Sequence, residues 1–294
     1  MNRQVLSKAK FGVREGVFRN AQSWLLAPAQ SRGPAAVNGL QAQAQRTLLL
    51  QSFSAFSDQP GGTINANGLR VAGLSLNISD QPIPIACFSP TAGGTAKAHT
   101  TIGIAISQNT SVSVDAVQSA GGNFGYAIGA LPLEGQIPST EAQADYYAYV
   151  CGLGTTGVVA PGNTGTCQAV VLRGGWLGLV SAVNMLGTAV IADSDCILTD
   201  LTINGISQLA GGPTQQISMD FLNPNQSSTD DYILNVYVEP NSIITATFAN
   251  VNAAAANMNV GMAIFCKPYK KPSHAATHST SPTRSRRLTK NQRG

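Results

Sequence analysis

The sequence predicts an all-β protein, an antiparallel β-sandwich of the jelly-roll type. Three observations favour this class: short runs alternate apolar with polar residues, turn-forming residues separate these runs, and no segment between them has the length and periodicity of a crossover helix. The connections between the runs vary greatly in length, which favours a two-sheet sandwich over an up-and-down barrel.

Residues 1–50 are predicted to form a basic arm followed by a linker. Between residues 3 and 26, small and apolar residues recur at steps of three and four, with Lys10 and Arg14 off that stripe, so we expect an amphipathic helical arm. Two glycines inside this segment each cost on the order of 1 kcal/mol in a helix, so the helix should form only when it docks on another surface. Residues 31–45 follow as a linker rich in Gln, Ala and Gly.

The folded body is predicted to span residues 51–266. Apolar residues occupy odd positions up to Gly73, as at Leu69 and Val71, and even positions after it. This pattern is typical of a strand with a bulge at the glycine. Three further short runs are expected to be strands; they lie at 83–88, 102–106 and 112–116.

Residues 118–166 are less regular and rich in Gly and small polar residues, so we expect long exposed loops there, with a short helix over 139–147. Loops of this length in a compact domain are usually functional or make contacts. The segment contains acids followed by an aromatic patch: Glu134, Glu141 and Asp145, then Tyr146, Tyr147 and Tyr149.

Strand signals become dense after residue 169. Short apolar runs come first, and five alternating runs follow them. The first group lies at 170–172, 176–180 and 188–192, and the second at 197–203, 217–221, 232–238, 244–248 and 260–266. About ten strands in all fit one sandwich or two, with a division of the body near residue 185 in the second case.

The basic residues lie almost entirely at the two ends of the chain. Residues 1–50 hold seven Lys or Arg and one acid, residues 51–266 hold three bases and 13 acids, and residues 267–294 hold eight bases and no acid, giving net charges of +6, −10 and +8. The last segment is rich in Pro, Ser and Thr and is predicted to be disordered until it binds a partner. Cationic arms on an acidic body predict binding to nucleic acid through its phosphates, without sequence preference.

The candidate nucleic-acid-binding residues are eleven of the fifteen bases of the two arms. They are Lys8, Lys10, Arg14, Arg19, Lys270, Lys271, Arg284, Arg286, Arg287, Lys290 and Arg293. Two alternative roles for the arms stay open: the tails only confer solubility, or the amphipathic N-terminal segment contacts an anionic lipid surface. The acid-poor start of the chain also has the composition of an organellar transit peptide.

No arrangement of residues predicts catalysis, and we expect no metal, no cofactor and no enzymatic activity. The five cysteines have no Cys-x-x-Cys spacing, so they are expected to be reduced and buried, with a Cys151–Cys167 bridge as the alternative. His99 is the one histidine of the body and has no evident nucleophile to activate. Two pairs of acids are explained by turn chemistry, with a calcium site between loops as the alternative; these are Asp193 with Asp195, and Asp230 with Asp231.

An acidic, many-stranded β body with an uncharged surface, long loops and basic arms resembles the coat subunits of small icosahedral viruses and the jelly-roll capsid proteins of some phages. The resemblance implies a homo-oligomeric shell: identical subunits tile a virion, assembled in the host cytoplasm, while the arms project inward onto the genome. Many such subunits carry one basic arm, whereas this chain has two, so the N-terminal helix could instead contact neighbouring subunits or an internal lipid layer. The alternative function is a trimeric spike, fibre or adhesin head that binds a receptor or glycan through residues 118–166.

Overall fold

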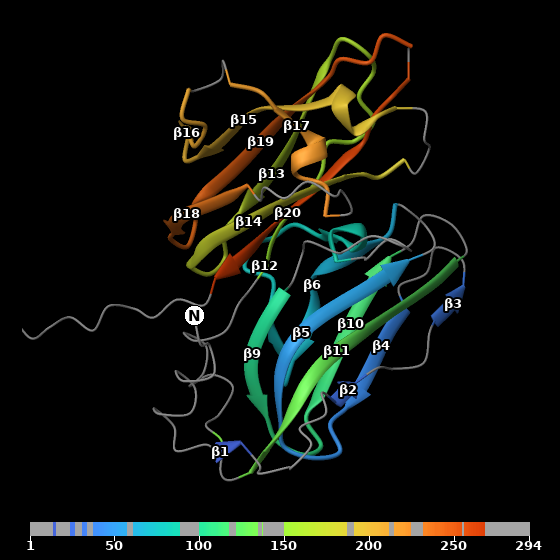
Figure 1. The fold of residues 1–294 in the computed structure, drawn as a ribbon, viewed down its shortest axis with the longest axis vertical. Helices are drawn as coiled ribbons and strands as arrows, with labels where there is room; N and C mark the ends of the chain where they lie inside the picture. The colour runs from blue at the N-terminus through green and yellow to red at the C-terminus, as the bar shows by residue number, and fades with distance from the viewer. Residues whose placement is uncertain are drawn as a thin grey trace, which may run out of the picture.

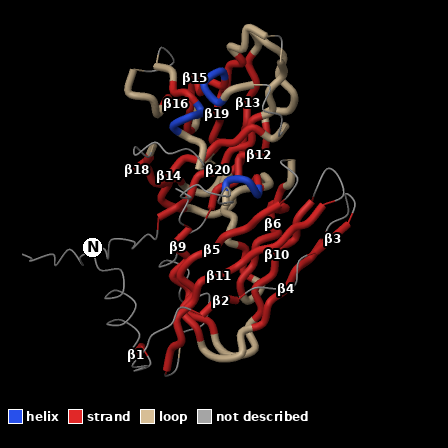
Figure 2. The backbone as a smooth tube through the Cα atoms, turned by 45° about the vertical axis from the view of Figure 1, so that its right-hand side comes forward, coloured by secondary structure: helices blue, strands red, loops and turns tan. Residues whose placement is uncertain are grey.

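The computed structural model confirms the all-β class (Figures 1 and 2). It describes residues 14–15, 24–26, 31–33, 38–57, 61–88, 100–117, 122–134, 137, 150–186, 191–211, 215–224, 232–254 and 256–267. In these residues the strands form four antiparallel sheets, and the helices are short 3-10 turns: η1 (Ile85–Cys87), η3 (Asp193–Asp195) and η5 (Met219–Phe221). Figure 1 shows the chain as two stacked halves, with the first half below the second.

The first half contains two facing sheets. A six-stranded sheet has the order β1-β11-β5-β9, with β2 and β3 also paired along β11, and a five-stranded sheet has the order β4-β10-β6-β7, with β8 paired to β6. Their bounds are β1 (Arg14–Glu15), β2 (Trp24–Leu26), β3 (Ser31–Gly33), β4 (Asn38–Gln43), β5 (Leu48–Ser57), β6 (Thr63–Val71), β7 (Leu74–Ser75), β8 (Ile83–Pro84), β9 (Thr100–Ile106), β10 (Ser111–Val117) and β11 (Gly122–Glu134).

The second half repeats this plan. A four-stranded sheet has the order β12-β20-β14-β18, and a five-stranded sheet has the order β13-β19-β15-β16, with β17 paired to β15. Their bounds are β12 (Val150–Thr155), β13 (Thr164–Val170), β14 (Gly175–Asn184), β15 (Cys196–Ile203), β16 (Ile206–Ser207), β17 (Ile217–Ser218), β18 (Ile233–Val238), β19 (Ile243–Asn250) and β20 (Val260–Lys267).

Strand pairing is nested in both halves. In the second half the first strand pairs with the last, β12 with β20, and successive pairs lie inside it: β13 with β19, β14 with β18, and β15 with β16 and β17. In the first half the same nesting joins β2 and β3 with β11, β4 with β10, β5 with β9, and β6 with β7 and β8.

The two halves also share the details of their turns. Non-glycine residues with positive φ occur at Ala72 and Asn109 in the first half and at Asn204 and Asn241 in the second. Each of the two in the first half lies 132 positions before its counterpart in the second. The register repeats at the same spacing, since Val71 opposes Val112 in the first half and Ile203 opposes Ile244 in the second. A residue of one half can therefore be assigned a structural equivalent in the other.

The predicted bulge at Gly73 is wrong, because the chain reverses direction there. Ala72 and Gly73 have φ values of 52° and 81°, and they connect β6 to β7 as a hairpin. A two-residue hairpin turn of this kind needs positive φ at both positions, which glycine adopts without strain. The change of apolar parity in the sequence therefore marks two strands and not one bent strand.

Strands replace part of the predicted loops and arm. Residues 118–166 contain β11, β12 and the start of β13, while the predicted helix over 139–147 lies outside the described residues. The residues assigned to the arm and linker include β4 and the start of β5, so the sheets begin before residue 51. Within the predicted helix over 3–26, the two described segments, β1 and β2, are strands paired with β11; the backbone there completes its hydrogen bonds with a sheet edge.

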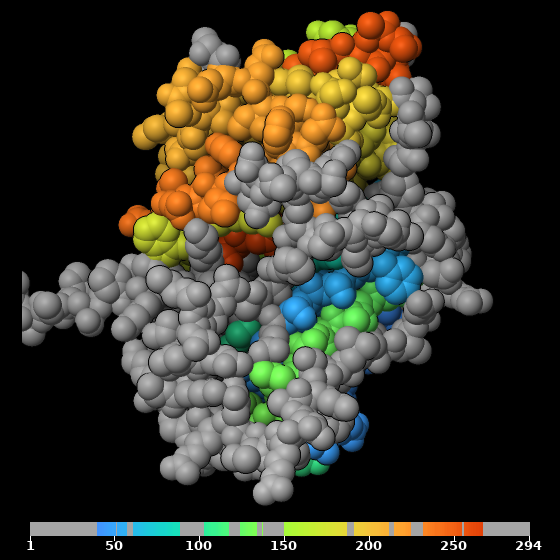
Figure 3. Space-filling view, viewed as in Figure 1, coloured from blue at the N-terminus to red at the C-terminus, as the bar shows by residue number. Residues whose placement is uncertain are grey.

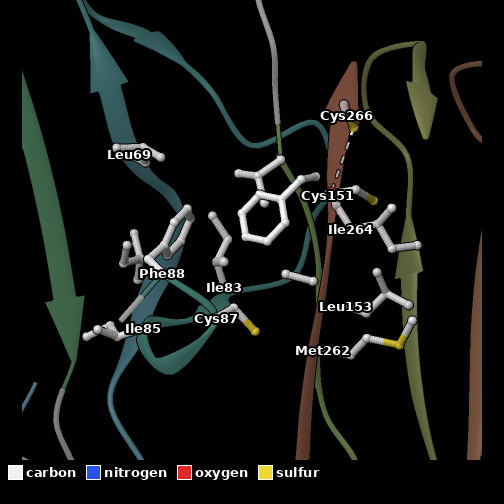
Figure 4. Packing of buried hydrophobic residues seen from close by; sticks show 14 of the residues in the cluster. Leu69, Ile83, Ile85, Cys87, Phe88, Cys151, Leu153, Met262, Ile264 and Cys266 are labelled. Carbon is white, nitrogen blue, oxygen red and sulfur yellow. Dashed lines mark hydrogen bonds between the residues drawn. The ribbon is translucent and has the colours of Figure 1, made fainter. Parts of the chain in front are cut away.

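The halves are joined through one continuous core. In β20 all residues from Val260 to Cys266 are buried, and successive side chains of a strand point to opposite faces, so both faces of this strand are covered. One face packs inside the second half, and the other packs against the segment around Ile83, Cys87 and Phe88 of the first half (Figure 4). The predicted division near residue 185 does not coincide with a sheet boundary, because β14 ends at Asn184 and pairs with β18 and β20.

Candidate nucleic-acid interface

Each half has one end made of short turns, which we name the tight-turn end. The opposite end of the same strands, in the second half, is made of longer connections, and we name it the long-loop end. The tight turns are residues 44–47, 72–73 and 107–110 in the first half and 171–174, 204–205 and 239–242 in the second; the long connections of the second half are 156–163, 185–195, 222–232 and 251–259.

Both basic arms are attached at tight-turn ends. In the first half, Arg14 of β1 lies opposite Glu134, the last residue of β11, so the chain that precedes Arg14 is attached at this end. In the second half, Lys267 is the last residue of β20 and lies opposite Trp176, near the start of β14. The nesting of the strands explains this arrangement, because the first and last strands of a nested set have their free ends on the same side.

Three further described bases lie at the same ends, while Arg32 of β3 lies opposite Asn123 near the start of β11, at the other end of the first half. Arg46 is in the turn between β4 and β5, Arg70 is two residues before the turn between β6 and β7, and Arg173 is in the turn between β13 and β14. The Arg173 guanidinium donates a hydrogen bond from Nη2 to the Ser75 carbonyl oxygen at 3.1 Å. Two acids, Asp80 and Glu239, lie at the tight-turn end of the second half and offset part of this charge.

Acidic residues gather at the long-loop end of the second half. Asp193 and Asp195 lie in η3 and Asp220 lies in η5, and all three act on the buried Cys196, whose pKa is raised to about 12 by burial and then by these carboxylates. Asparagines hold two of the carboxylates: Asn223 donates to Asp193 at 2.6 Å and Asn252 donates to Asp195 at 2.7 Å. A polyanion would be repelled from this end.

The predicted binding residues are placed only in part. Among them Arg14 is described, and its backbone lies in β1. The other ten lie outside the described residues; they are Lys8, Lys10, Arg19, Lys270, Lys271, Arg284, Arg286, Arg287, Lys290 and Arg293. Arg46, Arg70 and Arg173 were not among the predicted binding residues, although each stands beside a turn signal; the sequence alone does not show that these turns share an end with the arms.

The described residues contain no group of three His, Cys, Asp or Glu side chains that could hold a metal ion. Several residues singled out in the sequence lie outside them, namely His99, Glu141, Asp145, Asp230, Asp231, Tyr146, Tyr147 and Tyr149. Within the same part of the chain, no helix combines the length and the apolar composition needed to cross a membrane.

All five cysteines are free and buried, as predicted from their spacing. Burial raises the pKa of the Cys87 and Cys151 thiols to about 12. The thiolate is the reactive form, so these groups should be almost unreactive near pH 8. We expect the native protein to react with a thiol-specific reagent such as DTNB far more slowly than protein unfolded in guanidinium, which should titrate all five; fast native labelling at pH 8 would contradict the buried assignment.

No model of a known protein family matches this chain, and no curated protein matches it significantly. Two solved structures show a distant likeness. One is PBCV-1 VP54, whose crystal structure was fitted into a cryo-EM reconstruction of the virophage Sputnik; it is 9% identical, with a TM-score of 0.31, over 86% of this chain and 95% of that chain. The other is a recombinant N-glycanase F (PNGase F), 10% identical, with a TM-score of 0.32, over 84% of this chain and 96% of that chain.

Proposed function

We propose that this chain is a structural subunit of a virion shell, in which each half is a jelly roll and the basic arms bind packaged nucleic acid. The observation that carries the proposal is that two basic termini join the sandwiches at their tight-turn ends: residues 1–13 hold three bases and no acid, and residues 267–294 hold eight bases and no acid. A subunit of this kind would present one basic side to the genome.

The jelly-roll assignment is supported by the nested pairing. A jelly roll is a pair of sheets formed when one long antiparallel hairpin of eight strands is rolled up. The first strand then pairs with the eighth, the second with the seventh, and so on inward, which is the order of β12 to β20 when β16 and β17 are taken as one interrupted strand. The first half follows the same order.

The surface of the body supports contacts with identical subunits. The outer side of the sheet formed by β13, β19 and β15 has threonines on all three strands, including Thr166, Thr199, Thr202, Thr245 and Thr247. Asp200 is an acid on the same side. A sheet face of short uncharged side chains can approach a neighbour closely without burying unpaired charge. Apart from Asp200, these threonines fit the uncharged surface expected from the composition.

The arms supply binding that does not depend on base sequence. Lys and Arg contact phosphates and release the counterions condensed on nucleic acid. Aromatic residues that could stack on bases are scarce in the tail, where Tyr269 stands alone, so contacts with phosphates should dominate.

The full chain should form closed particles that co-purify with nucleic acid. We would express it alone, purify it at low salt, and examine it by electron microscopy and by the ratio of absorbance at 260 and 280 nm. Monomers or small oligomers free of nucleic acid would overturn the proposal. A stable small oligomer that ignores nucleic acid but binds a glycan array would favour the spike, fibre or adhesin alternative.

A further inference from the structure

The contact between the two halves is made by one edge of the first half. This edge comprises residues 74–88, which include β7, β8 and η1, and we name it the first edge segment. It is joined to the second half by backbone hydrogen bonds, from Ile78 N to Val150 O at 2.9 Å and from Val150 N to Leu76 O at 3.0 Å. It lies on the outer face of the β12-β20-β14 sheet.

Small residues on that sheet let the first edge segment approach closely. A Cβ added at Gly261 would lie 2.7 Å from the Pro84 ring, and Ala263 is also fully buried. Cys87 donates from Sγ to the Ser181 carbonyl oxygen at 3.8 Å, and the Phe88 and Phe265 rings meet edge to face at 5.4 Å. Small and aromatic residues thus form a fitted apolar contact.

The second half has an equivalent edge with nothing docked on it within the described part of the chain. The second edge segment comprises residues 206–211 and 215–222, which include β16, β17 and η5. Its start copies the first edge segment, because Leu209 N bonds to Ser207 Oγ as Asn77 N bonds to Ser75 Oγ. Phe221 occupies the η5 position equivalent to Cys87 in η1 and is 49% exposed, while Ile206, equivalent to Leu74, is 70% exposed.

The first half likewise has an equivalent of the receiving face. In both halves a bulge interrupts one strand pairing on this sheet. In the first half, β5 pairs with β11 and the register shifts between Gly129 and Ala130 of β11. In the second half, β14 pairs with β20 and the register shifts between Leu177 and Leu179 of β14. When the two sheets are aligned on these bulges, Ser54 and Ala127, which lie opposite each other in the first half, take the positions of Ser181 and Ala263 in the second half.

This face carries short side chains, as the receiving face of the second half does. Ser52 is exposed, Phe56 is 36% exposed, and Ala127 and Gly129 are half-buried. Atoms of β5 and β11 are visible on the front of the first half in Figure 3.

We propose that copies of this chain associate head to tail, with the second edge segment of one copy on the β5–β11 face of the next. The contact repeats between copies the one already made within the chain, and it seats Phe221 beside Ser54 and Ala127 of the neighbour. The inference deepens the proposed function and rests on it, since it names the surface through which the subunits of the shell meet. A head-to-tail contact of this kind forms a closed ring when the rotation that relates one copy to the next is a whole fraction of a full turn.

The test uses the double variant Phe221→Cys with Ser54→Cys in the full chain. The native cysteines are buried, so a short bis-maleimide should link residue 221 of one copy to residue 54 of another, giving a ladder of covalent multimers on a denaturing gel. The single variants should give none. The matched control pairs Phe221→Cys with Val251→Cys, because Val251 is exposed but lies outside both surfaces.

A second variant measures the energy of the contact. Phe221→Arg should weaken association by about 30-fold, as for a central interface residue, whereas Val251→Arg should leave it unchanged; sedimentation measures both. If particles form but residues 221 and 54 do not cross-link and Phe221→Arg has no effect, this inference fails and the proposed function stands. If the unmodified chain stays monomeric without nucleic acid, the proposed function fails, and the inference fails with it.

Discussion

Replacing Gly152 by alanine should destabilise the protein by about 1–3 kcal/mol, the usual range for overpacking a close contact. A Cβ at this position would lie 2.7 Å from the Pro82 carbonyl oxygen and 2.8 Å from the Gln81 carbonyl oxygen. Both are backbone atoms of the first half, so neither can rotate away as a flexible side chain would. The alanine must push the halves apart or distort β12.

Gly152 also lies within a buried hydrogen-bond network centred on Asn77. The Asn77 side-chain oxygen accepts from Gly152 N at 3.0 Å and from Ser79 Oγ at 3.0 Å, and its amide donates to the Gln81 carbonyl oxygen at 2.7 Å. Asn77→Leu would remove the partner of Gly152 N and of the Gln81 carbonyl oxygen, at a cost of about 1–3 kcal/mol for each buried group left unpaired, whereas Ser79 Oγ keeps its hydrogen bond to the Gly152 carbonyl oxygen at 2.6 Å. The two variants should therefore damage the same contact by different routes.

Chemical denaturation measured by tryptophan fluorescence tests both variants. Thr155→Val is the matched control, since Thr155 is an exposed residue of the same strand; its stability should stay within about 0.5 kcal/mol of the unmodified protein. Equal midpoints for Gly152→Ala and the control would contradict the close contact between the halves.

Neutralising five bases of the C-terminal arm should strongly reduce the salt dependence of nucleic-acid binding. The variant changes five bases to glutamine: Arg284, Arg286, Arg287, Lys290 and Arg293. Each lost phosphate contact should reduce the slope of log K against log salt by about 0.9 on duplex DNA, so five could reduce it by about 4.5. Affinity at low salt should fall by several orders of magnitude.

Fluorescence anisotropy with labelled duplexes of two unrelated sequences, over a range of salt, measures this slope. The matched control changes five neutral residues of the same tail to alanine, namely Ser279, Thr280, Ser281, Thr283 and Ser285. Equal slopes for the two variants would show that these bases make no phosphate contacts. A difference between the two duplexes would contradict binding without sequence preference.

The alternation of apolar and polar residues was sufficient to predict a strand that has one buried and one exposed face. In β10, Val112, Val114 and Ala116 are buried while the residues between them are half-exposed, and this run was predicted. β11 was missed because glycines interrupt its apolar pattern, although Phe124 and Ile128 are fully buried. The glycines that weaken the strand signal are positions where neighbours approach closely, such as Gly129 beside Ser52.

For the candidate interface, too, one part of the description came from the sequence and the other came from the structure. The charge of the arms is a property of composition, so it was available without any structure. Their attachment at the tight-turn ends depends on pairs such as Arg14 with Glu134, which are far apart along the chain. No local pattern contains that information.

By itself the sequence determined the all-β class, the short strands with period-two burial and the opposite charges of body and arms, because each follows from neighbouring residues or from composition. Only the tertiary structure decided that two equivalent halves exist, which strands pair, and that residues 74–88 of one half complete the core of the other. These features depend on contacts between distant segments, whose partners are selected by the packing of the whole chain and not by local propensity.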